Sequence, residues 1–212
     1  MISIHKFTVN PFQENSYLLS DETGECLIVD AGFFTRPERH KLAVYLEASG
    51  LKPVGLINTH CHFDHLLGVE YLRGKYGIPF ECHSNDAFWL QMAHDQAASF
   101  GIQMDNPAPA DHLWEEEQEF HFGKSAVKII RVPGHSPGHV VFYAPDEGFV
   151  LAGDVLFYLS IGRFDLPGGD YHQLITGIQE KLMVLPPETV VWSGHGPETT
   201  IGFEKMNNPY LV

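Results

Sequence analysis

One short stretch of the chain, residues 56–65, gathers residue types that bind metal ions. Three histidines and one aspartate fall within six positions of it, directly after an apolar run that predicts a buried strand. Imidazole nitrogens and carboxylate oxygens are ligands that borderline-soft divalent metals accept. His60 and His62 are two positions apart, so their side chains share one face of an extended backbone. Asp64 and His65 follow in a turn and can face a second site. Because four unpaired polar side chains are costly to bury, the cluster predicts metal binding.

Four other stretches repeat one pattern, in which a predicted strand ends in a glycine-containing turn that carries a potential ligand. They lie at 30–32, 133–139, 152–154 and 193–196. Glycine permits unusual backbone angles and a close approach to a bound centre. With the first cluster, these turns supply the ligands of a two-metal site, in which a water or hydroxide completes the bridge. We expect His60, His62 and His135 to hold one metal and Asp64, His65 and His195 to hold the other, with Asp154 bridging both.

These side chains must be positioned by strands and helices that the sequence also indicates. Short β-rich runs predict strands over 2–9, 15–20, 26–29, 54–58, 78–83, 120–122, 127–132, 140–144, 149–151 and 189–192. Helical patterns cover 37–49, 66–76, 85–104 and 171–184, the first between a possible N-cap at Thr35 and a stop at Gly50. Two strand-rich halves, each followed by helices, predict two sheets packed face to face with helices outside. The expected fold class is therefore an α/β layered sandwich and not a doubly wound parallel sheet.

The length and charge of the chain narrow its class. A chain of 212 residues fits one domain, 1–212, and its net charge of −14 argues against a nucleic-acid partner. The acidic run 115–119 is interpreted as solvated surface. No run approaches a membrane span, and the N-terminus alternates like a strand and lacks the apolar core of a signal peptide. A soluble cytoplasmic protein is expected.

The three cysteines form no pattern and are interpreted as buried free thiols in a reducing compartment. Cys61 lies between two candidate ligands, but alternation points it to the opposite face, so it is not counted as a ligand. Other histidines lack local ligand partners and are interpreted as surface or structural residues. The large side chains of Phe88, Trp89, Met92, Phe100 and Met104 could line a lid over a substrate or form a helix core.

The motif Thr59-His60-Cys61-His62-Phe63-Asp64-His65, followed by Gly134-His135, Gly153-Asp154 and Gly194-His195, resembles the metallo-β-lactamase superfamily. The resemblance covers nearly the whole chain and implies an αββα four-layer sandwich with metals at one edge. Asp64 and the bridging Asp154 resemble the hydrolase branch typified by glyoxalase II, whereas true β-lactamases commonly carry a cysteine at the bridging position. The segments 162–170 and 204–209 resemble small bacterial glyoxalase II-like proteins.

Two departures from larger glyoxalase II enzymes bear on the substrate. The chain ends soon after His195, so the C-terminal helical domain that helps to hold glutathione is not expected. Where that group offers a lysine and a tyrosine to glutathione, this chain reads Gly162-Arg163-Phe164-Asp165. Arg163 could replace the lysine and contact substrate, but Asp165 does not replace the tyrosine. The carrier thiol is therefore left open between glutathione and a smaller or different thiol.

The expected reaction is hydrolysis of a small acyl-thiol by a metal-bridging hydroxide. Asp64 is expected to be a ligand and to orient the nucleophile. Asp30 and Asp165 are candidates to accept the distal N–H of ligand histidines. His139 is interpreted as closing its turn, with a supporting contact to the ligands as the alternative. Two divalent metal ions are expected, with zinc first and iron or manganese as alternatives. The competing functions are a persulfide dioxygenase with one iron on His60, His135 and Asp154, a lactone hydrolase, and a non-catalytic metal-dependent binding protein. The oligomeric state is not predicted.

Overall fold

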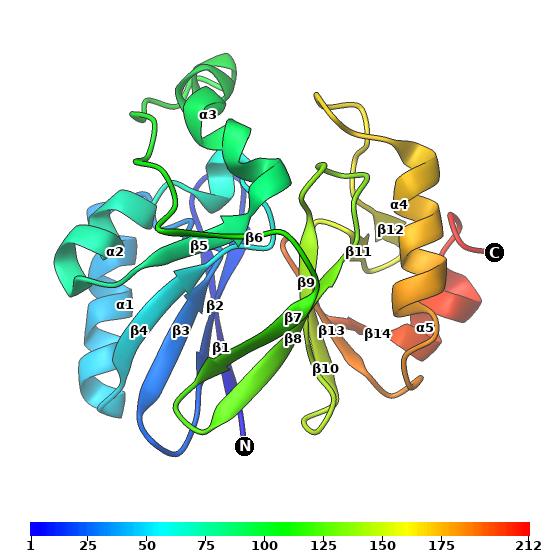
Figure 1. Ribbon diagram of the computed structural model, residues 1–212, viewed down its shortest axis with the longest axis horizontal. Coiled ribbons are helices and arrows are strands. Elements are labelled where there is room, and N and C mark those ends of the chain that lie inside the picture. The colour runs from blue at the N-terminus through cyan, green and yellow to red at the C-terminus, as the bar shows by residue number, and fades with distance from the viewer. The chain divides into compact units, whose positions relative to one another are not determined.

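The computed structural model describes residues 1–212, which form two compact units (Figure 1). The first unit comprises residues 1–114 together with 121–125, and the second comprises 115–120 together with 126–212. Each unit combines one six-stranded sheet with helices. The tip of the hairpin between the strands β7 and β8 belongs to the first unit, although these strands pair in the second sheet.

The sheet of the first unit is mixed, and its strand order follows the chain from β1 to β6. β1, β2 and β3 pair antiparallel, and β3, β4, β5 and β6 continue as parallel neighbours. The C-terminal ends of β3, β4 and β5 therefore lie at the same edge, where the turns after them begin. The strands are β1 Ser3–Val9, β2 Glu14–Ser20, β3 Glu25–Val29, β4 Lys52–Ile57, β5 Phe80–His83 and β6 His112–Trp114.

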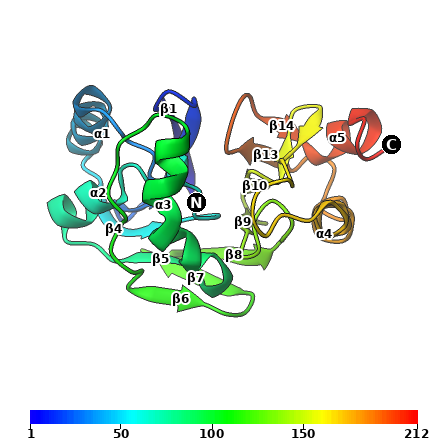
Figure 2. The same ribbon diagram turned by 90° about the horizontal axis from the view of Figure 1, so that it is seen from above.

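The helices of the first unit are α1 Arg36–Ser49, α2 Val69–Tyr76 and α3 Ala87–Ser99. Thr35 caps the start of α1 and Gly50 ends it with a left-handed backbone, as the sequence predicts. In the structure Glu38 completes a reciprocal capping box with Thr35. Leu42 and Leu46 are buried in the core of this unit. Figures 1 and 2 place α1 and α2 next to each other on one side of the sheet.

Two predicted helices are shorter in the structure. The helix expected over 66–76 begins at Val69, because a 3₁₀ turn, Phe63–His65, precedes it and Gly68 packs tightly on the preceding chain. The Gly68 amide donates to the Ala31 carbonyl at 2.7 Å, and a Cβ at Gly68 would lie 2.8 Å from that oxygen. The helix expected over 85–104 ends at Ser99, close to Gly101, whose positive φ of 75° departs from helical geometry.

The sheet of the second unit has the order β14-β13-β10-β9-β8-β7, with β10 and β13 parallel. Its core contains Val141, Val150 and Val191 together with Leu174 and Ile178 from the helical segment. The strands are β7 Gln118–Phe122, β8 Ser125–Arg131, β9 Val140–Ala144, β10 Phe149–Gly153, β13 Val190–Ser193 and β14 Thr199–Thr200, and β11 Leu156–Phe157 and β12 Ser160–Ile161 form a separate hairpin.

The helical segment predicted over 171–184 is α4 Tyr171–Gly177, which continues as a π-helical turn, Ile178–Leu182. A further helix, α5 Ile201–Asn207, was not predicted. The interpretation of 115–119 as solvated surface is confirmed, because all five residues are exposed, including the two that begin β7. In addition, the Glu117 carboxylate accepts the Arg131 amide and pairs with Lys181. No helix in the structure has the length and apolar character needed to cross a membrane.

Candidate metal centre

In the first unit, the loop after β4 is closed on itself by a buried amide. The side chain of Asn58 donates to the carbonyls of His60 at 3.1 Å and of His65 at 3.0 Å. These two bonds hold both ends of the loop, so its histidines are fixed on a buried stretch of backbone. His60, His62 and His65 are 1%, 3% and 0% exposed. Four of the predicted ligands are thus displayed by one short, rigid loop.

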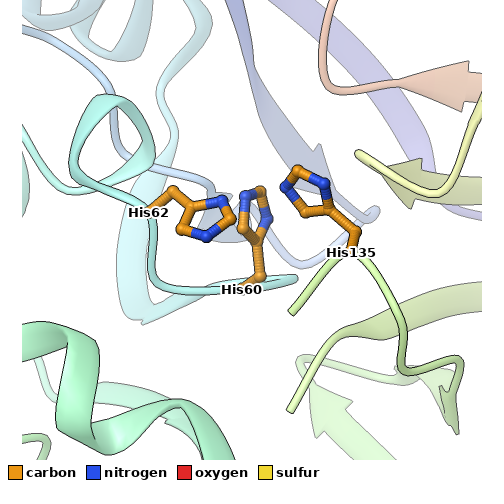
Figure 3. A group of neighbouring side chains, drawn as sticks. All are labelled: His60, His62 and His135. Carbon is orange, nitrogen blue, oxygen red and sulfur yellow. The ribbon is translucent and has the colours of Figure 1, made fainter. Parts of the chain in front are cut away.

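The side chains of this loop lie close together. The ring of His60 is centred 4.7 Å from that of His62 and 4.2 Å from that of His65. Figure 3 shows the rings of His60 and His62 adjacent on their loop. The Nε2 atom of His65 lies 3.9 Å from Oδ2 of Asp64. Cys61 instead contacts Cys82, and burial raises the pKa of its thiol well above the usual value, so it is a structural thiol.

The backbone of Asp64 is tied to the start of the chain. Asn10, which has a left-handed backbone with φ 51°, donates from its side chain to the carbonyls of Asp64 at 3.0 Å and Gly32 at 3.2 Å. The backbone N–H of Asn10 in turn donates to Oε1 of Glu38, the residue that completes the N-terminal cap of α1. A helix terminus therefore helps to position the loop that carries Asp64.

Two buried carboxyl groups approach the ring of His65. Oδ2 of Asp30 lies 3.5 Å and Oε1 of Glu14 lies 3.7 Å from its Nδ1 atom. Asp30 also accepts hydrogen bonds from Thr59, at 2.7 Å from the amide and 2.8 Å from the hydroxyl. The predicted role of Asp30, to accept a ligand histidine N–H, stays a prediction because 3.5 Å exceeds hydrogen-bond range.

Glu14 was not among the residues predicted from the sequence: it opens β2, a strand in which every following residue but the last is buried in the structure. It is fully buried, and burial raises the pKa of its carboxyl well above the usual value, while nearby His65 acts in the opposite direction. Its Oε2 atom accepts the Ser16 hydroxyl at 2.9 Å.

The aromatic and methionine side chains of residues 88–104 were expected either to line a lid or to form a helix core, and the structure divides them between these two roles. Trp89 is buried, and its ring is centred 4.7 Å from that of His62, so it belongs to the core that supports the loop. Phe88, Met92 and Phe100 are exposed. Met104 is half-buried and packs against the core, so the three exposed side chains are the better candidates for a lid.

In the second unit, Asp154 lies between two histidines. Its Oδ2 atom is 3.7 Å from Nε2 of His135 and 3.6 Å from Nε2 of His195. The three residues follow the ends of β8, β10 and β13, the strand-end turns that the sequence indicates. The amide of Gly194 donates to the Gly153 carbonyl at 2.7 Å, which joins two of these turns.

The spacing of these atoms fits metal ligation better than direct hydrogen bonding. Both distances exceed the range of an N–H···O hydrogen bond. Two ligand atoms that bind one tetrahedral ion at about 2.0–2.2 Å lie about 3.4 Å from each other. One carboxylate oxygen almost equidistant from two imidazole nitrogens, at 3.7 and 3.6 Å, therefore needs only a small adjustment to share ions with both. The donor set of nitrogens and carboxylate oxygens suits a divalent metal.

Backbone groups orient this part of the site. Nδ1 of His135 lies 2.8 Å from the carbonyl of Arg163, which selects the tautomer with a proton on Nδ1 and leaves Nε2 for a metal (Figure 3 shows this ring on its loop). Nε2 of His139 accepts the amide of Asp154 at 3.0 Å. His139 therefore contacts the backbone of a predicted ligand and does more than close its own turn.

The prediction for Asp165 is wrong. Its carboxylate forms two hydrogen bonds with the Arg163 guanidinium, at 2.8 and 2.9 Å, and does not accept a ligand histidine N–H. The carbonyl of Arg163 takes that role, and a sequence cannot indicate a backbone acceptor. The hydrogen bond to Asp165 raises the pKa of Arg163, and the same bond lowers the pKa of Asp165. The Arg163 side chain is half exposed and so remains accessible.

Comparison with known proteins gives a consistent result. Residues 9–195 match the family model described as the metallo-beta-lactamase superfamily. The chain is 42% identical over 209 residues to "Probable metallo-hydrolase YqgX" of Bacillus subtilis, covering 97% of this chain and 96% of that protein. It is 33% identical over 217 residues to "Hydroxyacylglutathione hydrolase GloC" of Haemophilus influenzae, covering 99% and 98%.

Solved structures agree with these relatives. The crystal structure of the BLEG-1 B3 metallo-beta-lactamase matches with a TM-score of 0.92 and 37% identity, covering 99% of this chain and 100% of that one. The structure of TTHA1623 in a di-iron-bound form matches with a TM-score of 0.88 and 38% identity, covering 98% and 100%.

Proposed function

The chain belongs to the metallo-beta-lactamase superfamily and has its fold, and from this premise we propose that it is a dinuclear hydrolase of small thioesters. That it is a metal-dependent hydrolase follows from the family and from its His/Asp donor groups. The two-metal state, the thioester substrate and the individual ligands are the content of the proposal.

The observation that carries the two-metal state is the position of Asp154. Its Oδ2 atom lies within 3.7 Å of the Nε2 atoms of both His135 and His195, which the sequence assigns to different metals. A carboxylate placed in this way is suited to bridge two ions. We assign His60, His62 and His135 to one ion and Asp64, His65 and His195 to the other, with Asp154 between them.

When bound, the metal ions supply an activated water near neutral pH and stabilise negative charge on the acyl oxygen. The protein's own residues hold this arrangement: Asn58 fixes the histidine loop, Asn10 holds the backbone of Asp64, and the Arg163 carbonyl sets the tautomer of His135. A departing thiol has a pKa of about 8.5, so the thiolate leaves without a strong general acid. The absence of such an acid from the proposed ligand set is consistent with a thioester substrate.

The acyl-thiol class is further supported by a relative. GloC of Haemophilus influenzae is named a hydroxyacylglutathione hydrolase, and the chain aligns with nearly its whole length. We propose zinc as the resident metal, with iron and manganese as alternatives, since mixed His/Asp sites accept all three. Iron is kept as an alternative because the similar protein TTHA1623 has been solved in a di-iron-bound form. The three buried free cysteines fit a reducing compartment, so we propose a cytoplasmic location.

We propose Arg163 as a contact for a negatively charged carrier thiol, which predicts a specific kinetic change. Arg163→Ala should raise KM about fivefold with little change in kcat, because it removes binding shared by the ground and transition states. The His135 contact involves the Arg163 carbonyl, so alanine preserves it. Lys181→Ala, which removes another surface ion pair of this unit, is the matched control and should leave KM unchanged. Equal KM values in both variants would reject this role for Arg163.

The experiment that tests the function is a substrate panel on metal-loaded protein. We expect thiol release from hydroxyacyl thioesters, at a higher kcat/KM than for lactones or for a β-lactam. The carrier is identified by comparing glutathione thioesters with those of smaller thiols. If the protein consumes oxygen with a persulfide substrate and contains one iron atom per chain, it is a dioxygenase and the proposed thioester hydrolysis is wrong. No turnover on the whole panel, with metal bound, would favour a binding protein.

A further inference from the structure

Glu14 is a buried carboxyl group to which the reaction outlined above gives no role. It lies at the start of β2 and is fully buried. Its Oε2 atom accepts the Ser16 hydroxyl, whose oxygen in turn accepts the amide of Gly32 at 3.0 Å. Its Oε1 atom is buried and accepts no hydrogen bond. A buried acceptor without a donor is destabilising, so stability alone does not account for a glutamate at this position.

The fold leaves space for this carboxyl group. Gly32 lies in the turn after β3, and a Cβ at that position would come within 2.0 Å of Oε2 of Glu14. It would also come within 2.7 Å of the Asp64 carbonyl. The glycine therefore lets the carboxyl group and the backbone of a proposed ligand approach each other closely.

The orphaned oxygen faces His65. Oε1 of Glu14 lies 3.7 Å from Nδ1 of His65, and Oδ2 of Asp30 lies 3.5 Å from the same atom. Asp30 is already engaged, because each of its oxygens accepts a short bond from Thr59. Oε1 of Glu14 accepts no bond at all, so it gains more from the His65 N–H than an oxygen that already has a donor. A shift of less than about 1 Å brings it to hydrogen-bond distance.

We infer that Glu14, and not Asp30, is the positioning residue that accepts the Nδ1 proton of His65 and so holds its Nε2 atom toward a metal. This inference rests on the proposed ligand role of His65. An acceptor on one imidazole nitrogen fixes the tautomer and ring orientation, and it makes the other nitrogen a better ligand. The Arg163 carbonyl does the same for His135, so the two histidines are held by different kinds of acceptor.

The test measures the affinity of each of the two metal ions by chelator competition. Loss of such an acceptor typically weakens metal binding about 10- to 100-fold. Glu14→Met keeps the side-chain volume and removes the acceptor. We expect it to weaken the binding of one metal ion by this factor and to leave the affinity for the other ion unchanged. Glu14→Gln retains an acceptor oxygen and should recover most of the affinity. Ser16→Ala, which leaves Oε1 in place, should change the affinity less than threefold.

Long-range proton–nitrogen NMR of the zinc-loaded protein supplies a second readout, with His65 assigned by a His65→Gln variant. Wild type should show a proton on Nδ1 of His65 that is protected from exchange, and Glu14→Met should lose this protection. Asp30→Asn should keep this protected proton, and its loss in Asp30→Asn would assign the role to Asp30 even if the methionine variant does not fold.

Two results would overturn the inference. The first is unchanged metal affinity in Glu14→Met. The second is a loss of one ion in Asp30→Asn while Glu14→Met keeps both, which would assign the role to Asp30. A wild-type protein that binds no metal would refute the proposed function itself, so the two failures are distinguishable.

Discussion

At the level of single residues, the proposed metal ligands are held in place by groups that are not ligands themselves. The Arg163 carbonyl orients His135, and the His139 ring holds the amide of Asp154. Gly162 is the tightest such position, because a Cβ there would lie 1.8 Å from the Asp154 carbonyl oxygen and 3.2 Å from Nδ1 of His135. Backbone packing of this kind fixes ligands without leaving a recognisable sequence motif.

Gly162→Ala is therefore expected to displace Asp154 and to lower both metal content and turnover. Overpacking of this kind costs about 1–3 kcal/mol of unfolding free energy. The control is Gly74→Ala, an exchange in α2 where a Cβ meets no atom within 4 Å and alanine should stabilise the helix by up to about 1 kcal/mol. Metal analysis and thermal unfolding of both variants check this, and a fully loaded, fully active Gly162→Ala protein would contradict it.

At the level of the secondary-structure elements, the predicted ligands follow strand ends, and turns between strands are held by carboxylates. Asp21, after β2, accepts hydrogen bonds from the amides of Thr23 and Lys124 and from the Ser125 hydroxyl. Burial raises the pKa of its carboxyl, but these hydrogen bonds outweigh that effect and the net pKa is lowered. Asp21 thus joins two turns of the first unit while it is ionised.

This linkage has a defined pH dependence. Because the folded pKa of Asp21 is lowered, its contribution to stability is complete above the unfolded value of about 3.9 and is lost as the pH falls through the folded pKa. The difference in unfolding free energy between wild type and Asp21→Asn should therefore be constant from pH 7 to about 5 and shrink below about pH 4. Denaturant titrations check this, with the exposed neighbour Glu22→Gln as control. A difference that is still full at pH 3 would contradict the assignment.

The elements that the sequence predicts are those with a strong local signal. The N-cap at Thr35, the stop at Gly50 and the strand β9 Val140–Ala144 all agree with the structure. The hairpin strands β11 and β12 and the strand β14 have two residues each, too few for a periodic pattern. That hairpin is held by Glu204 of α5, which accepts the Leu159 amide and the Asn208 side chain. Such contacts join distant segments, so local patterns do not reveal them.

At the scale of the whole molecule, the superfamily and fold class expected from the sequence are confirmed by the family match and by structures with TM-scores of 0.92 and 0.88. The superfamily and fold class could be predicted because each ligand motif follows a predicted strand. Glu14 and the Arg163 carbonyl were not predictable, since their roles arise only when separate strands and loops are folded together. The organisation of 1–212 as one domain stays a prediction.

Metal removal should destabilise the whole chain if folded protein alone binds the ions. At a metal concentration about 100 times Kd, each bound ion adds about 2.7 kcal/mol. Removal of both ions should therefore lower Tm by about 11 to 22 °C, at about 2–4 °C per kcal/mol for a chain of this size. Differential scanning calorimetry with and without chelator checks this, and re-addition of zinc should restore the original Tm. An unchanged Tm after verified metal removal would contradict coupling between the ions and the fold.

Elemental analysis of the purified, metal-saturated protein shows whether two metal ions share Asp154. Wild type should contain about two metal ions per chain, and Asp154→Ala should contain fewer and show no turnover while remaining folded. Asp165→Ala, which alters an exposed carboxylate of the same unit, should retain both ions. One ion per chain in saturated wild type, or a fully active Asp154→Ala protein, would contradict the dinuclear account.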